Sequence, residues 1–354
     1  MENIKEKNKL ARIEYIDIAR AIAILIIVLG HTLNHSENCK LIFKFLYSFN
    51  VVLFFILSGY TFKIRENESF YEFAKRKFIR IMIPYFIWEL LWLIPYIFLG
   101  KNVGNFLETE SSFDIKAMLI NILYGNGNSS ALKQNSSLWF LPALFSIEII
   151  YYYIIKFINI SKRKSIVVLI FSLLISYAST YLLEFKLPWG INTVLNIGGI
   201  FFLIGYLLNN MFEINKLFKI YYIFPILIIG ILAMNFNSTV SCIDYIYGNL
   251  TLAILSGLCL SIVIIYISYL IKNNNILEYI GRNTMGILIF HKLVILIVQT
   301  KLGVISTQLK NSNILIEFLL SIVTVMLSVV FSLICVVVLR KILPILIGEN
   351  KSSK

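Results

Sequence analysis

The sequence is poor in charge, and above all in negative charge. Charged residues make up only 14% of its 354 residues, with 19 acidic against 32 basic side chains. Hydrophobic residues make up 58%, and the mean hydropathy is +0.82. A soluble domain needs far more polar surface, so this composition excludes that class and predicts an all-α integral membrane protein. Apolar segments recur along the whole chain without an internal repeat, which indicates one polytopic domain over residues 1–354.

Patterns typical of metal and redox sites are also missing. The four cysteines form no Cys-x-x-Cys motif, and the three histidines do not cluster with them, so we expect no metal site. Cys39 and Cys242 both fall on the predicted outer side, where a disulfide is chemically allowed. Two unpaired thiols remain the favoured interpretation, because no spacing rule requires a pair.

Ten segments are long and apolar enough to span a bilayer as helices. They are residues 15–33, 41–62, 79–100, 138–156, 165–183, 190–209, 218–236, 248–271, 284–300 and 314–339. Three further segments connect or follow them. We expect an amphipathic surface helix at 113–124, a flexible loop at 125–137, and an interfacial apolar piece after residue 340.

The basic residues decide the orientation of these spans. Most lysines and arginines fall in alternate connections, and the positive-inside rule places those connections in the cytoplasm. Both termini are therefore predicted to be cytoplasmic, in a multi-pass protein of the plasma membrane. The net charge of +13 is then explained by contact with anionic lipid of the bilayer, and nucleic acid is not an expected partner.

The first span contains "RAIAILIIVLGHT", which begins and ends on ionisable side chains. Arg20 and His31 are eleven residues apart, three helical turns plus about 20°, so they share one face and lie roughly 16 Å apart. Snorkelling of Arg20 and an interfacial His31 are the simpler interpretations, but a shared face favours a cavity. A signal peptide is disfavoured because no small-x-small site follows, and Asp17 lies one turn before Arg20.

Several motifs follow one another in a specific order. After Arg20-x10-His31 come "FFILSG" at 54–59, a basic "FAKRKFIRIMIPYFIW" around Pro84, "SSLWFLPALF" at 136–145, "FFLIGYLL" at 201–208 and "GRNTMGILIFHK" at 281–292. This ordered set, over residues 12–292, resembles membrane-bound acyltransferase family 3, the O-acetyltransferases of surface glycans, including fucose 4-O-acetylase-like members. One departure is Asn50, where many members have histidine, and an amide cannot act as a general base.

The resemblance implies transfer of an acetyl group from cytoplasmic acetyl-CoA to a hydroxyl of an outer-face carbohydrate. His31 would act as general base or carry the acetyl group itself, two mechanisms that the sequence does not separate. Asp17 would hold Arg20 in place. The phosphates of CoA, a donor and not a permanently bound cofactor, would contact four basic residues: Arg20, Arg76, Lys77 and Arg80.

Five further residues are expected on the acceptor and acyl path: Asn50, Ser58, Glu89, Trp139 and His291. Each also has a plainer structural explanation. Ser58 could serve helix packing, His291 an interhelical hydrogen bond, and Trp139 the interfacial aromatic belt. Glu89, like Glu148, could simply neutralise a buried cation.

Two other functions fit ten spans with intramembrane charges: a transporter of a small solute, and a glycan-export component. A transporter often carries internal repeats, and none is visible. A glycan-export component needs neither His31 nor CoA. The single line from Arg20 to His31 and the basic inner face favour the enzyme.

Overall fold

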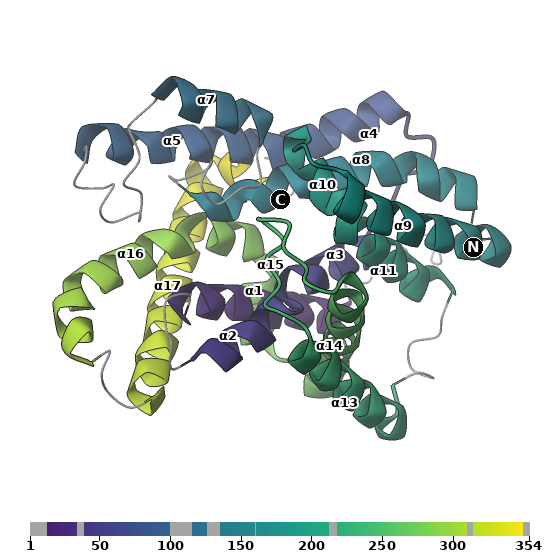
Figure 1. Ribbon diagram of the computed structural model, residues 1–354. Helices are drawn as coiled ribbons and strands as arrows, with labels where there is room; N and C mark the ends of the chain where they lie inside the picture. The colour runs from purple at the N-terminus through teal and green to yellow at the C-terminus, as the bar shows by residue number, and fades with distance from the viewer. Residues whose placement is uncertain are drawn as a thin grey trace.

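The computed structural model describes residues 13–33, 39–99, 115–125, 135–159, 161–211, 218–309 and 314–349 (Figure 1). Across these ranges the regular structure is helical, apart from an isolated antiparallel bridge between Ser241 and Ile246. Seven helical segments are long and apolar enough to cross a membrane, which makes this an all-α membrane protein. They are α1 (Glu14–Leu33), α2 (Lys40–Tyr47) with α3 (Asn50–Tyr60), η4 (Ser136–Trp139) with α8 (Phe140–Ile158), α9 (Lys162–Leu182), residues Pro188–Met211, α14 (Leu250–Ile271) and α17 (Ile314–Ile342).

The remaining expected spans correspond to three other helical regions. These are α5 (Ile83–Leu99), α13 (Ile220–Phe236), and the pair α15 (Asn275–Arg282) and α16 (Thr284–Leu309). The chain bends by 84° between α15 and α16, so that the pair forms a broken span or a re-entrant segment. Every expected span therefore overlaps a helix, while the number that crosses the bilayer and the side of the termini stay predictions.

The connections differ in detail from the sequence expectation. The expected surface helix is α7 (Ile115–Tyr124). Most of the expected flexible loop at 125–137 lies outside the described residues, but its last part is ordered. There the side chain of Asn135 caps the 3-10 turn η4, because it accepts a hydrogen bond from the Ser137 amide at 3.3 Å.

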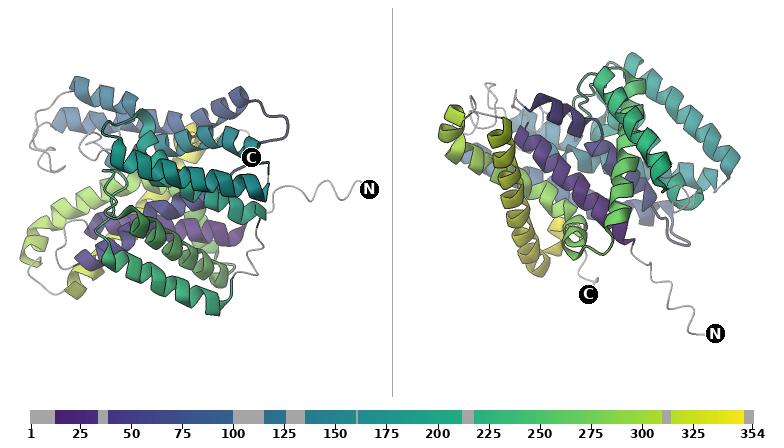
Figure 2. Two further views of the ribbon diagram at one scale, coloured as in Figure 1. Left: turned by 45° about the vertical axis from the view of Figure 1, so that its right-hand side comes forward. Right: turned by 90° about the horizontal axis from the view of Figure 1, so that it is seen from below.

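Helix α1 lies at the centre of the molecule and packs against α3, α14, α15, α16 and α17. The right-hand view of Figure 2 shows it between α17 on one side and the α13–α14 pair on the other. Its buried face includes small residues such as Ala19 and Ala23, which let neighbouring helices come close. A Cβ at Gly281 would lie 1.8 Å from the carbonyl oxygen of Asp17, so only glycine lets α15 cross α1 at this distance.

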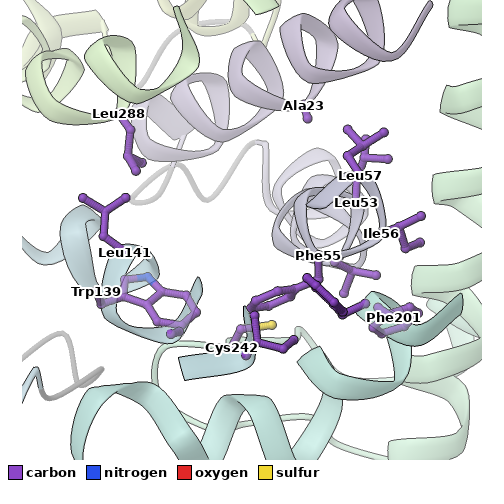
Figure 3. Close-up of a cluster of buried hydrophobic side chains, with 14 of the residues drawn as sticks. Ala23, Leu53, Phe55, Ile56, Leu57, Trp139, Leu141, Phe201, Cys242 and Leu288 are labelled. Carbon is purple, nitrogen blue, oxygen red and sulfur yellow. The ribbon is translucent and has the colours of Figure 1, made fainter. Parts of the chain in front are cut away.

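A second close helix contact joins α3 to α11 (Gly199–Met211). Cβ atoms at Gly59 and Gly205 would each lie 1.9 Å from a backbone oxygen of the opposite helix. Glycine at both positions therefore lets the two backbones touch. Figure 3 shows the apolar side chains packed around this contact, including Leu53, Ile56 and Phe201.

Two irregular segments shape one end of the molecule. Helix α4 (Phe70–Lys77), which begins at a capping box of Ser69 and Glu72, continues into a π-helical turn, η3 (Phe78–Met82), before α5. After α17 the chain forms a 3-10 turn, η7 (Pro344–Ile347), packed against α5 through a 2.8 Å bond from Trp88 Nε1 to the Leu346 carbonyl. The apolar piece after residue 340 thus contacts the protein itself.

The four cysteines are free thiols. Cys39 and Cys242 are both buried, as are Cys259 in α14 and, in part, Cys335 in α17. The structure thus contains no Cys39–Cys242 disulfide within the described residues, while the placement of both thiols on the outer side stays a prediction. Burial in the loop before α14 raises the pKa of the Cys242 thiol to about 12, which keeps it protonated and unreactive near neutral pH.

Candidate functional site

One cavity of about 660 Å³ extends along α1 and contacts both Arg20 and His31. Arg20 and His31 are eleven residues apart in α1, and the helix period therefore places both side chains on one face. Both line the same cavity, as the spacing predicts. We call the region around Arg20, Arg80 and Arg282 the basic end of the cavity. The region around His31, Ser137 and Lys292 is the histidine end.

Apolar side chains line the cavity between its two polar ends and extend to the histidine end. Figure 3 shows Leu288 of α16 and Leu141 of α8 pointing toward one another, with Trp139 beside them. All three side chains line the cavity. Further apolar lining side chains come from α1, α3 and α8, among them Ile24, Ile27, Phe54, Phe140 and Leu144. The cavity thus joins two polar ends through an apolar neck, as ligand pockets commonly do.

At the histidine end, two imidazoles from distant parts of the chain meet. The ring centroids of His31 in α1 and His291 in α16 are 5.3 Å apart, tilted by 34°. The Oγ atom of Ser137 lies 3.4 Å from the Nε2 atom of each ring. His291 is fully buried, whereas His31 borders the cavity.

Hydrogen bonds hold the elements that carry these groups. Asn135 Nδ2 donates to the Ile289 carbonyl at 3.2 Å, which ties η4 to α16. The Lys292 ammonium donates to the Ser136 hydroxyl, a second link between the same two elements. These two bonds join η4 to α16 and place Ser137 between the two rings, within the range at which proton transfer is organised.

At the basic end, two guanidinium groups share one buried carboxylate. Asp17, which is 2% exposed, lies 3.4 Å from Arg20 Nη1 and 3.3 Å from Arg282 Nε. Arg20 also donates to the Thr61 hydroxyl at 2.7 Å, and Arg282 pairs with Glu278. The two arginine side chains remain 27% and 40% exposed, so they are fixed by Asp17 and still accessible to an anion.

The three other predicted phosphate-binding residues lie differently from one another. Arg80, on the π-helical turn, lines the cavity. Lys77 also lines it, but its ammonium forms a buried 2.6 Å ion pair with Glu148 of α8, which confirms that this carboxylate neutralises a cation. Arg76 is not among the lining residues.

Arg76 instead makes two 2.7 Å bonds to Glu68, in the loop before α4. This bidentate hydrogen bonding lowers the pKa of the Glu68 carboxyl. The guanidinium is thus occupied by a protein carboxylate.

The expected acceptor and acyl-path residues divide into two groups. Asn50, Ser58 and Trp139 line the cavity. Glu89 and His291 are fully buried and do not line it. His291 contacts the site through Ser137, as described above, whereas Glu89 lies within α5.

Several cavity residues escape sequence reasoning. Ser137, Arg282 and Lys292 occur inside motifs that carry the family resemblance, yet nothing in their spacing shows that they meet residues of α1. The loop segment 239–244, on the predicted outer side, also lines the histidine end of the cavity and includes Asp244. In the sequence, this segment is marked only by its position between the predicted spans 218–236 and 248–271.

The chemistry available follows from these groups. The histidine end offers two imidazoles, a hydroxyl and an ammonium, which suit proton transfer and stabilisation of a developing negative charge. The basic end offers guanidinium groups, which suit phosphates. Across the described ranges, no three His, Cys, Asp or Glu side chains gather to hold a metal ion.

Comparison with known proteins gives one match. No curated protein and no solved structure matches the chain. The family model described as "Acyltransferase domain" matches residues 13–333, nearly the whole described chain, and it includes α1, both ends of the cavity and α16. This chain belongs to membrane-bound acyltransferase family 3, and it is a membrane acyltransferase.

Proposed function

We propose that this acyltransferase moves an acetyl group from cytoplasmic acetyl-CoA to a hydroxyl of a carbohydrate at the outer face of the plasma membrane. The observation that carries the proposal is a continuous cavity with guanidinium groups at one end and His31 at the other. A phosphate-rich thioester and a hydroxyl acceptor can then meet inside one protein, each approaching from its own side.

The donor would bind with its phosphates at the basic end. Arg20, Arg80 and Arg282 all line the cavity there, and guanidinium groups bind phosphate through charge-assisted, often bidentate hydrogen bonds. The pantetheine arm would follow the apolar neck. Its length is matched by the roughly 16 Å of helix that separates Arg20 from His31.

Transfer would take place at the histidine end. His31 accepts the proton of the acceptor hydroxyl while that oxygen attacks the thioester carbonyl. The C–S bond then breaks, the acetyl group stays on the acceptor oxygen, and the CoA sulfur leaves as thiolate and recovers the proton from His31. The Lys292 ammonium, which also lines the cavity, is placed to stabilise the oxyanion of the tetrahedral intermediate.

The acceptor would be a carbohydrate bound at the outer mouth. Phe43, Tyr47 and Trp139 border this end of the cavity together with Asn50 and Asp244. Aromatic faces next to hydroxyl-binding carboxylate and amide groups suit a sugar ring. This combination supports a glycan acceptor over a small apolar alcohol.

The experiment is a comparison of His31→Ala with the neighbouring Thr32→Ala. Within the part of the chain that the structure describes, the Thr32 hydroxyl donates to the Leu29 carbonyl of its own helix at 2.8 Å, and Thr32 does not line the cavity. We expect both variants to accumulate in the membrane, and only His31→Ala to lose O-acetyl groups from the surface glycan of the producing cells. Normal glycan acetylation in His31→Ala would refute the proposed function.

A further inference from the structure

Ser137 lies between His31 and His291 and contacts both rings. The proposed reaction does not yet assign it a role. The Ser137 hydroxyl lies 3.4 Å from Nε2 of both His31 and His291, and its side chain is buried. Such distances are long for a hydrogen bond, but catalytic contacts in a protein without substrate often are, and they shorten in the complex. The question is which atoms carry the protons.

His291 fixes the first proton. Its Nδ1 atom lies 2.9 Å from the Ile287 carbonyl oxygen, one turn earlier in α16. A carbonyl oxygen only accepts, so Nδ1 must carry a hydrogen. In a neutral imidazole the other nitrogen then has a lone pair, and Nε2 of His291 is an acceptor facing Ser137.

The tautomer of His291 determines where the hydroxyl hydrogen of Ser137 points. Ser137 has one hydrogen, and donating it to His291 Nε2 leaves its oxygen as an acceptor for His31. His31 then carries its hydrogen on Nε2, and its Nδ1 is the free base. The reverse arrangement, with Ser137 donating to His31, would put the serine lone pairs against the lone pair of His291 Nε2. Only the first arrangement satisfies all three groups.

We propose that Ser137 is a positioning residue that, together with His291, fixes the tautomer of the general base His31. The inference rests on the proposed function and identifies Nδ1 of His31 as the atom that accepts the proton of the acceptor hydroxyl. In the transfer step, the O–H bond of the acceptor breaks as the Nδ1–H bond of His31 forms, while Ser137 keeps its proton. The imidazolium so formed donates more strongly to Ser137 Oγ, which stabilises it, as a fixed hydrogen-bond partner orients the base in other acyl-transfer sites.

The first test compares Ser137→Ala and Ser137→Thr with a control serine in the following helix. Ser146 of α8 is similarly buried, donates to the Trp189 carbonyl at 2.9 Å and does not line the cavity. With membranes, radiolabelled acetyl-CoA and the surface glycan, we expect Ser137→Ala to lower kcat about tenfold to a hundredfold at unchanged KM for acetyl-CoA. Ser137→Thr, which keeps the hydroxyl, should retain most of kcat, and Ser146→Ala should equal the parent.

The second test changes His291 and does not depend on the folding of a serine variant. Glutamine can place an acceptor oxygen near the position of Nε2, whereas the shorter asparagine reaches only toward that of Nδ1. We expect His291→Gln to keep clearly more kcat than His291→Asn, again with KM unchanged. Equal kcat in the two variants would contradict the role of Nε2.

Two further results would also overturn the inference without affecting the proposed function. One is a kcat for Ser137→Ala equal to that of the parent. The other is an acetyl group found on Ser137 by mass spectrometry of protein incubated with acetyl-CoA, because Ser137 would then be a nucleophile. Failure of the proposed function would be visible separately, as retained transfer in His31→Ala.

Discussion

Removal of the Arg282 guanidinium should weaken acetyl-CoA binding with little effect on the chemical step. Arg282 lines the basic end and is held by Asp17 at 3.3 Å. A hydrogen bond to a charged group contributes about 1.5–3 kcal/mol. Because the Arg282 side chain is 40% exposed, water competes for it, and we take the lower figure. The expected result for Arg282→Ala is about a tenfold rise in the Kd of acetyl-CoA.

The assay is equilibrium binding of radiolabelled acetyl-CoA to purified protein in detergent, together with initial rates at saturating acceptor. KM equals Kd only when chemistry is slow, so both are needed. Arg65→Ala is the control, since Arg65 is exposed and does not line the cavity. An unchanged Kd in Arg282→Ala, or an equal rise in Arg65→Ala, would refute a phosphate site at the basic end.

Three further changes test other parts of the structure. Glu148→Gln leaves the buried Lys77 ammonium without its carboxylate, so the free energy of unfolding, measured by thermal denaturation in detergent, should fall by about 3 kcal/mol. Adding Lys77→Met should recover most of this loss. No recovery would argue against the ion pair as the cause. Gly59→Val places a side chain against the Phe202 carbonyl and should abolish monodisperse protein in size-exclusion chromatography, and a normal elution profile would contradict the tight α3–α11 contact. Deletion of 343–354 removes the turn whose residues line the basic end. The KM for acetyl-CoA should then rise severalfold while kcat is largely kept. An unchanged KM would show that this turn does not contribute to donor binding.

The features that the sequence predicts well are local. Helices follow from long apolar segments, and the shared face of Arg20 and His31 follows from the helix period alone. Both depend on residues within one helix. For the same reason the existence of the ten helical segments is predictable, although the sharp bend between α15 and α16 is not.

The features that the sequence misses are tertiary. Arg76 and Lys77 are neighbours in one basic run, yet about 100° of helix rotation separates them. Their partners decide their roles: Glu68, eight residues away, binds Arg76, and Glu148, from another helix, binds Lys77. No pattern in the basic run itself distinguishes the two residues.

The histidine end shows the same limit. Ser137 and His291 are 154 residues apart, and each belongs to a motif that contains no sign of the other. Their contact depends on how η4 packs against α16, which is set by hydrogen bonds such as that from Asn135 to the Ile289 carbonyl. The sequence predicts that His291 is a polar residue at membrane depth. Its partner, Ser137, can be identified only from the folded structure.

The proposed transfer across the membrane is tested most directly with membrane vesicles of both orientations that contain the surface glycan. Radiolabelled acetyl-CoA is supplied outside the vesicles, and label in the glycan is measured. We predict transfer only in inside-out vesicles, where the donor can reach the basic end, and none in inside-out vesicles of His31→Ala, although that variant still binds acetyl-CoA. Equal transfer in right-side-out vesicles, or transfer by His31→Ala, would contradict the proposed path from Arg20 to His31.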